Sequence, residues 1–132
     1  MKSELSKKHL TWIAVVLVLG AALFYFKVDL SRNAMNAQLS INFPDGQSRK
    51  FEGPVVTDMT VLEALYSSFL GDNFELKYSM REDNSVVLAK IGDAVKFGNH
   101  DWHFYLNGKP VKTSDINKIR IKAGDFIEVD YE

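Results

Sequence analysis

The chain has 132 residues, a formal net charge of −1 and no cysteine. This length allows one ordinary domain, or one small domain that carries an anchor. The lack of cysteine excludes a disulfide scaffold, a thiolate zinc site, an iron–sulfur cluster and a cysteine nucleophile. The near-zero charge argues against broad electrostatic binding to nucleic acid, so we expect no nucleic-acid partner.

The first distinctive segment is an uncharged apolar stretch of 17 residues, from Leu10 to Phe26. Its length is at the short end of the range that crosses a bilayer as a helix. Trp12 and Tyr25 near its two ends suit the two membrane interfaces. We therefore expect residues 10–26 to be a transmembrane signal anchor, through which the chain associates with the membrane.

Lysines precede this stretch, at positions 2, 7 and 8. An excess of lysine before the span favours a cytoplasmic N-terminus, here residues 1–9, in a single-pass protein of the cytoplasmic membrane. The polar residues 27–37 are then a tether, and residues 38–132 an extracytoplasmic domain with a net charge of −4. A cleaved signal peptide is the main alternative, although no small-x-small cleavage site stands out, and a buried helix is the other.

The domain opens with a predicted hairpin and a helix. Leu39, Ile41 and Phe43 alternate with polar residues, which predicts a strand over 38–43. A Pro-Asp-Gly turn leads to a second strand over 48–55, where Pro54 is typical of an edge strand. Thr60 and Glu63 fit a capping box, which predicts a helix that ends before Gly71. Its apolar face is predicted to hold Leu62, Leu65, Tyr66 and Phe69.

The rest of the chain reads as strands and turns. Alternating residues over 74–80 and a more continuous apolar run over 85–91 predict two strands, the second more buried. A strand over 102–106 precedes Asn107-Gly108, the strongest short hairpin signal, and a return arm over 109–112. Gly124-Asp125 begins the last strand, 126–132, which places Ile127, Val129 and Tyr131 opposite Glu128, Asp130 and Glu132. One helix among several strands predicts a two-layer α+β domain.

Two segments carry a resemblance to a known family. They are Trp102 to Lys109, an aromatic strand followed by Asn-Gly, and Ile121 to Tyr131, where Gly-Asp precedes the final strand. They resemble the transcobalamin C-terminal-like domains, a β-grasp family that includes many exported bacterial proteins of uncharacterised function. The segment from Thr60 to Leu65 also resembles the start of that family's helix. The resemblance implies a ubiquitin-like β-grasp fold with a mixed sheet and one main helix.

The resemblance implies cobalamin only weakly. In the vitamin carriers of this family, the domain packs over a corrin that a separate helical barrel holds, and this chain has no room for such a barrel. We expect no obligatory cofactor. Because the sequence ends in Val-Asp-Tyr-Glu, we expect neither a sulfur carrier nor a ubiquitin-like tag, roles that need a terminal Gly-Gly.

The candidate site residues come from the same segments. The candidate ligand- or partner-binding residues are Trp102, His103, Tyr105 and Asn107, because exposed aromatic side chains are enriched in binding patches. Within the strand, Trp102 shares a face with Phe104 and His103 shares the other with Tyr105, and one of these faces must be core. The alternative is that these residues serve the fold alone. Asn107, Gly108, Gly124 and Asp125 are predicted to form structural turns.

No pattern in the sequence indicates catalysis. His100, Asp101 and His103 could offer metal ligands, but i,i+3 positions on an extended chain diverge, so we expect no metal. The carboxylates of Glu128, Asp130 and Glu132 could bind calcium or form a glycosidase-like pair, although a solvated face is the simpler interpretation. We therefore predict a non-enzymatic binding or interaction module at the cell envelope. The alternative is a binder of a small, planar or cobalamin-like ligand.

Overall fold

The computed structural model describes residues 35–71 and 74–132, and the part from Met35 to Glu132 forms one compact unit. The predicted cytoplasmic segment, the anchor and most of the tether lie outside the described residues. Within the described part of the chain, no helix is long and apolar enough to cross a membrane. The first strand begins at Asn36, so the last two residues of the predicted tether, Asn36 and Ala37, are strand residues.

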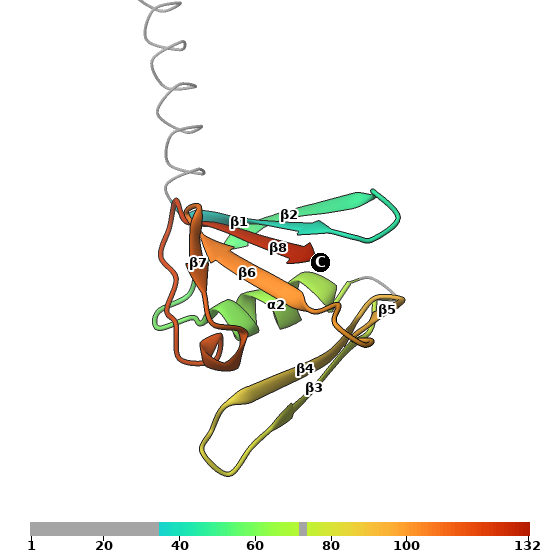
Figure 1. Cartoon of the computed structure of the whole chain (residues 1–132). Coiled ribbons are helices and arrows are strands. Elements are labelled where there is room, and N and C mark those ends of the chain that lie inside the picture. The colour runs from blue at the N-terminus through green and yellow to red at the C-terminus, as the bar shows by residue number, and fades with distance from the viewer. Residues whose placement is uncertain (1–34, 72–73) are drawn as a thin grey trace, which may run out of the picture. The chain divides into compact units, whose positions relative to one another are not determined.

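The larger sheet has five strands in the order β2-β1-β8-β6-β7 (Figure 1). The central strands β1 and β8 run parallel, and every other neighbouring pair is antiparallel, so this sheet is mixed. Strand β2 lies at the edge, as Pro54 predicted. The strands are β1 (Asn36–Asn42), β2 (Ser48–Pro54), β6 (Trp102–Leu106), β7 (Lys109–Val111) and β8 (Phe126–Tyr131).

A second, smaller sheet has three antiparallel strands in the order β3-β4-β5. It consists of β3 (Leu76–Met80), β4 (Val86–Ile91) and β5 (Ala94–Val95). The prediction did not separate these strands from the others, because sequence alternation does not state which strands pair. In Figure 1 the β3–β4 hairpin diverges from the five-stranded sheet, on the side where the helix lies.

The α-helix of the described residues is α2 (Val61–Phe69). The predicted capping box is present: Thr60 Oγ1 accepts the Glu63 N–H, and the Glu63 carboxylate accepts the Thr60 N–H at 2.7 Å. These bonds lower the pKa of Glu63. The predicted apolar face is wrong at Tyr66, which is 53% exposed. Val61, one helical turn before Leu65, takes its place in the core.

One hydrophobic core joins the two sheets, the helix and Ile116, which follows the short 3₁₀ turn η1 (Thr113–Asp115). The inner face of the larger sheet contributes alternate residues of each central strand, as the period-2 pattern predicted. Aromatic rings connect the layers: Phe51 packs edge-on against Phe69, with ring centroids 5.7 Å apart. The fully buried residues are Ile41, Val61, Leu65, Ile91, Trp102, Phe104, Ile116, Ile127 and Val129. The α+β class, the mixed sheet and the main helix are therefore confirmed.

Candidate functional site

One cavity of the described residues is a groove between the β1–β2 hairpin and helix α2. Its volume is about 660 Å³. The floor is apolar, because the buried side chains of Leu39, Ile121 and Ile127 line it. We call this cavity the hairpin–helix groove; its further lining includes Phe51, Val55, Val56, Met59, Ala64, Ser67 and Ser68.

The mouth of the groove is formed by the loop between β2 and α2. Val56 lines the groove there and is 63% exposed. Backbone bonds hold the loop at both ends: the Val55 N–H donates to Met35 O at 2.9 Å, and the Ile121 N–H donates to Met59 O at 2.9 Å. The groove is therefore a preformed concavity with apolar residues at its entrance.

The polar residues that line the groove include Ser67 and Ser68 of α2 and Lys50 and Glu52 of β2. The Ser68 hydroxyl donates to Ala64 O at 2.8 Å, within the helix. Lys50 and Glu52 of β2 alternate with Phe51, so their side chains belong to the outer face of the sheet. A groove with an apolar floor suits an apolar or planar group, because removing apolar surface from water favours binding.

The structure separates the four predicted binding residues. Trp102 lies in the core with 1% exposed, and its ring packs 4.8 Å from that of Tyr131. Its Nε1 is buried without a hydrogen-bond partner among the described residues. His103 and Tyr105 are on the opposite, outer face of β6, where they pair with Asp130 and Glu128 of β8. A surface ligand can thus reach His103 and Tyr105, whereas Trp102 is unavailable to it.

Asn107 has a structural task in the β6–β7 turn. It has a φ of 52°, and the following Gly108 has a φ of 75°, which are the positive values that a two-residue hairpin turn requires. Asn107 Nδ2 donates to the carboxylate of Asp125 at 2.9 Å, and Asn107 Oδ1 accepts the Phe126 N–H at 2.9 Å. Asp125, which follows Gly124 and is 5% exposed, also accepts the Lys122 N–H. The two predicted turns are thus bonded to each other.

The histidine-rich segment does not converge. The His100 ring stacks on Tyr131, with centroids 6.0 Å apart, while His103 lies on the outer face of the sheet. Asp101 pairs with Lys96 and accepts the N–H of Trp102. Residues 35–71 and 74–132 contain no group of three or more histidine, aspartate or glutamate side chains that could hold a metal ion.

The carboxylates of β8 lie on its outer face and are half-buried there. Asn42 of β1 bridges them: its Nδ2 donates to Asp130 at 2.5 Å and to Glu128 at 3.4 Å. Glu132 bonds through its backbone to Asp101. This arrangement stabilises the β1–β8 pair and resembles a cross-strand polar contact more than a pair of acid and base groups.

The residues of the hairpin–helix groove were not among the predicted site residues. The available signal was the pair Val56 and Met59, apolar residues that lie between the predicted strand 48–55 and the predicted helix. Apolar residues in a connecting segment either pack beneath it or remain available to a ligand. The three-dimensional arrangement of β2 and α2 decides whether these residues are covered or accessible, and the sequence does not state it.

The sequence matches no family model and no curated protein. Solved structures are similar in fold. A candidate metal-binding protein from Ruminococcus gnavus ATCC 29149 superimposes with a TM-score of 0.60 and 16% identity, over 74% of this chain and 96% of that one. Haptocorrin in complex with Cbi superimposes with a TM-score of 0.61 and 10% identity, over 74% of this chain and 25% of haptocorrin. At these identities the likeness establishes a shared fold, related to that of the transcobalamin C-terminal-like domains.

Proposed function

We propose that the chain is a membrane-anchored, extracytoplasmic binding module without catalytic activity, and that the hairpin–helix groove holds the bound group. Residues 10–26 are the proposed anchor, with residues 1–9 in the cytoplasm and the described unit outside. The finer assignment to the β-grasp, transcobalamin-like family is part of this proposal. The fold shared with haptocorrin supports it.

The observation that carries the proposal is the groove itself. Its volume of about 660 Å³ is within the range of small-molecule sites, which is about 300–1,000 Å³. Its floor is apolar, and its mouth exposes Val56. We therefore propose an apolar or planar ligand. The corrin class is the first to test, because haptocorrin was solved with bound Cbi.

The test uses the full-length protein in lipid nanodiscs, because detergent would compete for an apolar groove. Cobalamin and haem are titrated separately by calorimetry. We expect saturable binding of one of them, and a loss of at least about tenfold in affinity in Ala64→Phe, equivalent to about 1.4 kcal/mol, since the larger side chain fills the groove. Tyr66→Phe is the matched control, because Tyr66 is on the same helix, is exposed and does not line the groove.

Two results would contradict the proposed site. Equal affinity in Ala64→Phe and wild type, with the fold intact by circular dichroism, would place the ligand elsewhere. Absence of binding by both probes would remove corrins and haem as ligands. It would leave the interaction of the module with a protein as its function.

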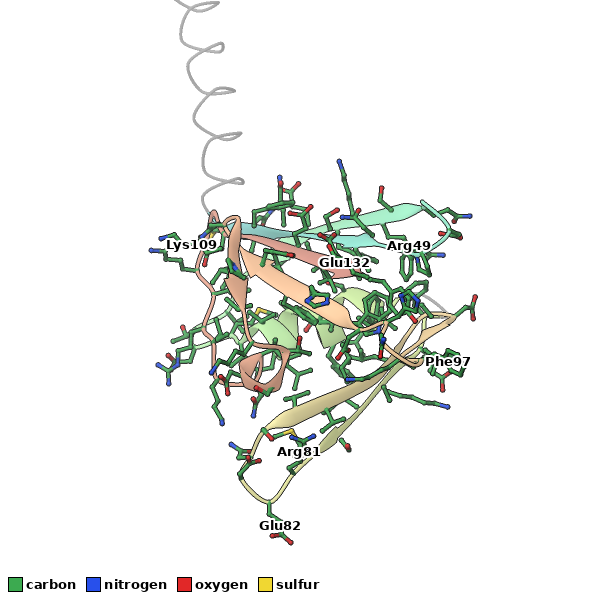
Figure 2. The ribbon with its side chains drawn as sticks, viewed as in Figure 1. Arg49, Arg81, Glu82, Phe97, Lys109 and Glu132 are labelled. Carbon is green, nitrogen blue, oxygen red and sulfur yellow. The ribbon has the colours of Figure 1, made fainter. Side chains whose placement is uncertain are left out.

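A protein partner is the second candidate, and the exposure of Phe97 favours it. This side chain is 79% exposed in the loop between β5 and β6, and the neighbouring Val95 is 51% exposed. Figure 2 shows Phe97 projecting from the molecule near β5. Exposed aromatic side chains are frequent anchors in protein interfaces. Cross-linking in native membranes should then yield a partner through a photoreactive group at position 97, and a group at Lys109 is the control.

A further inference from the structure

Strand β3 is an edge of the three-stranded sheet, and its backbone presents a regular row of groups to a further strand. The residues that flank β3 form backbone hydrogen bonds with the segments that flank β4. Gly92 N–H donates to Glu75 O at 2.8 Å, and Arg81 N–H donates to Ser85 O at 2.9 Å. Backbone groups alternate in direction along a strand. Since positions 75 and 81 point toward β4, the backbone groups of Leu76, Tyr78 and Met80 point outward.

The β3–β4 hairpin contains a β-bulge, but the bulge does not interrupt the outward-pointing backbone groups of β3. The register shifts between Lys77 and Tyr78, which pair with Lys90 and Leu88, so the additional residue is Ala89 of β4. β3 itself is therefore an uninterrupted strand. A regular edge of this kind is a template for an additional strand.

The exposed side chains of β3 are more apolar than those of edge strands that resist pairing with another chain. Tyr78 is 42% exposed and Met80 is 44% exposed, although their cross-strand partners Leu88 and Val86 are buried. Lys77, the residue that would normally discourage pairing, is bonded to Glu75 of its own chain at 2.9 Å. The strand contains no proline.

We propose that a second copy of this chain docks here, with the two β3 strands antiparallel and Tyr78 opposite Tyr78. In this register Leu76 lies opposite Met80 of the second copy, and all three outward-pointing residues form hydrogen-bonded pairs. On the other face, Glu75 lies opposite Arg81 of the second copy, and Lys77 lies opposite Ser79. Figure 2 shows Arg81 at the turn end of the β3–β4 hairpin, away from the larger sheet.

The charged side chains of β3 favour the register centred on Tyr78 over the registers centred on Lys77 or Ser79. Centring the pair on Lys77 would place Lys77 directly opposite Lys77 of the second copy. Centring it on Ser79 would place Arg81 opposite Lys77. Like charges directly opposite destabilise a strand pair, whereas opposite charges stabilise it. The register centred on Tyr78 avoids both like-charge pairs and adds the Glu75–Arg81 pair at each end. This proposal uses β3 alone and does not depend on the hairpin–helix groove.

The test uses disulfide formation in the full-length protein, which contains no cysteine of its own. Lys77→Cys and Ser79→Cys are produced in two differently tagged copies and oxidised together in membranes. We expect the mixed pair to cross-link at least about ten times faster than either variant with itself. The proposed register places positions 77 and 79 about 4.5 Å apart between Cα atoms. Identical positions are then diagonal neighbours at about 7–8 Å, beyond disulfide geometry.

A blocking variant separates pairing from random collision. Tyr78→Pro removes an outward N–H that β4 does not use, so the fold should persist while the mixed cross-link is lost. If circular dichroism shows that Tyr78→Pro does not fold, Tyr78→Lys replaces it, because it places like charges opposite each other. Equal rates for mixed and identical pairs, or a cross-link that survives the blocking variant, would overturn the proposal.

Discussion

The two sheets are built from similar hairpins but bury their apolar faces to different degrees. In the five-stranded sheet the inner residues Ile41 and Val129 are completely buried, and Phe104 is 1% exposed. In the three-stranded sheet only β4 is buried in this way, while Tyr78 and Met80 of β3 remain more than 40% exposed. The difference follows from position, because a central strand has neighbours on both sides and an edge strand has one.

This comparison shows what alternation in a sequence can and cannot predict. The pattern over 74–80 is as regular as the pattern over 38–43, and each predicts a strand that the structure contains, although β1 is largely buried and β3 largely exposed. The pattern states which side chains share a face. It does not state how much surface each one loses, which depends on the neighbouring strands.

The largest expected effect is the loss of stability when a fully buried residue of the five-stranded sheet is truncated. Ile41→Ala should lower the free energy of unfolding by about 2–5 kcal/mol, since it leaves a cavity in a fully packed core. Met80→Ala should cost less than about 1 kcal/mol, because much of that side chain is already in water. Urea unfolding followed by circular dichroism measures both. Similar losses for the two variants would show that the exposed edge is covered in solution.

A smaller effect compares the hairpin turns of the two sheets. Asn107→Ala should lower the free energy of unfolding by about 2 kcal/mol, since it removes two side-chain hydrogen bonds and strains a positive φ. Asn84→Ala in the β3–β4 turn, where φ is 60°, should cost about 1 kcal/mol, because there the backbone conformation is the main term. The same urea series measures the difference. A larger loss at Asn84 would contradict the structural role assigned to Asn107.

The smallest effect is a pH dependence that belongs to the three-stranded sheet. Hydrogen bonds from Lys77 and Lys90 lower the pKa of Glu75 from 4.5 to about 2. A lowered carboxylate pKa contributes stability that is fully present above about 4.5 and is lost as the pH falls toward 2. Glu75→Gln should therefore reduce the loss of stability across this window, measured as the urea midpoint at each pH. Because Glu75 is half exposed, high salt should reduce the effect, and an unchanged profile would show that the pairs do not persist in solution.

Local signals predicted the elements of this fold well. The capping box of Thr60 and Glu63 marks the helix start, and Asn107-Gly108 marks a hairpin turn, because each depends on residues close in sequence. The prediction at Tyr66 failed for a non-local reason. Periodicity predicts which helix residues share a face, but the neighbouring segments decide which of them are buried. The backbone N–H of Val61 donates to Ile119 O, so the start of the helix lies against the segment that contains Ile116 and Ile119 of the same core.

The site was less predictable than the fold. His103 and Tyr105 were correctly placed on one strand face, but no sequence rule states which face is core, and Trp102 proved to be inside. The hairpin–helix groove depends on the distance between β2 and α2, and the division into two sheets depends on pairing between distant segments. Both are properties of tertiary structure, on which a single sequence carries little direct information.

The parallel pairing of β1 with β8 also has a mechanical consequence. β1 is the first strand of the described unit and β8 is the last, and they are hydrogen-bonded from Gln38 opposite Phe126 to Asn42 opposite Asp130. Tension between the chain before Asn36 and the chain end after Tyr131 would pull these strands in opposite directions along their length. All the bonds of the ladder would then be loaded together in shear, instead of opening one at a time, so the domain should resist extension along the line between its ends.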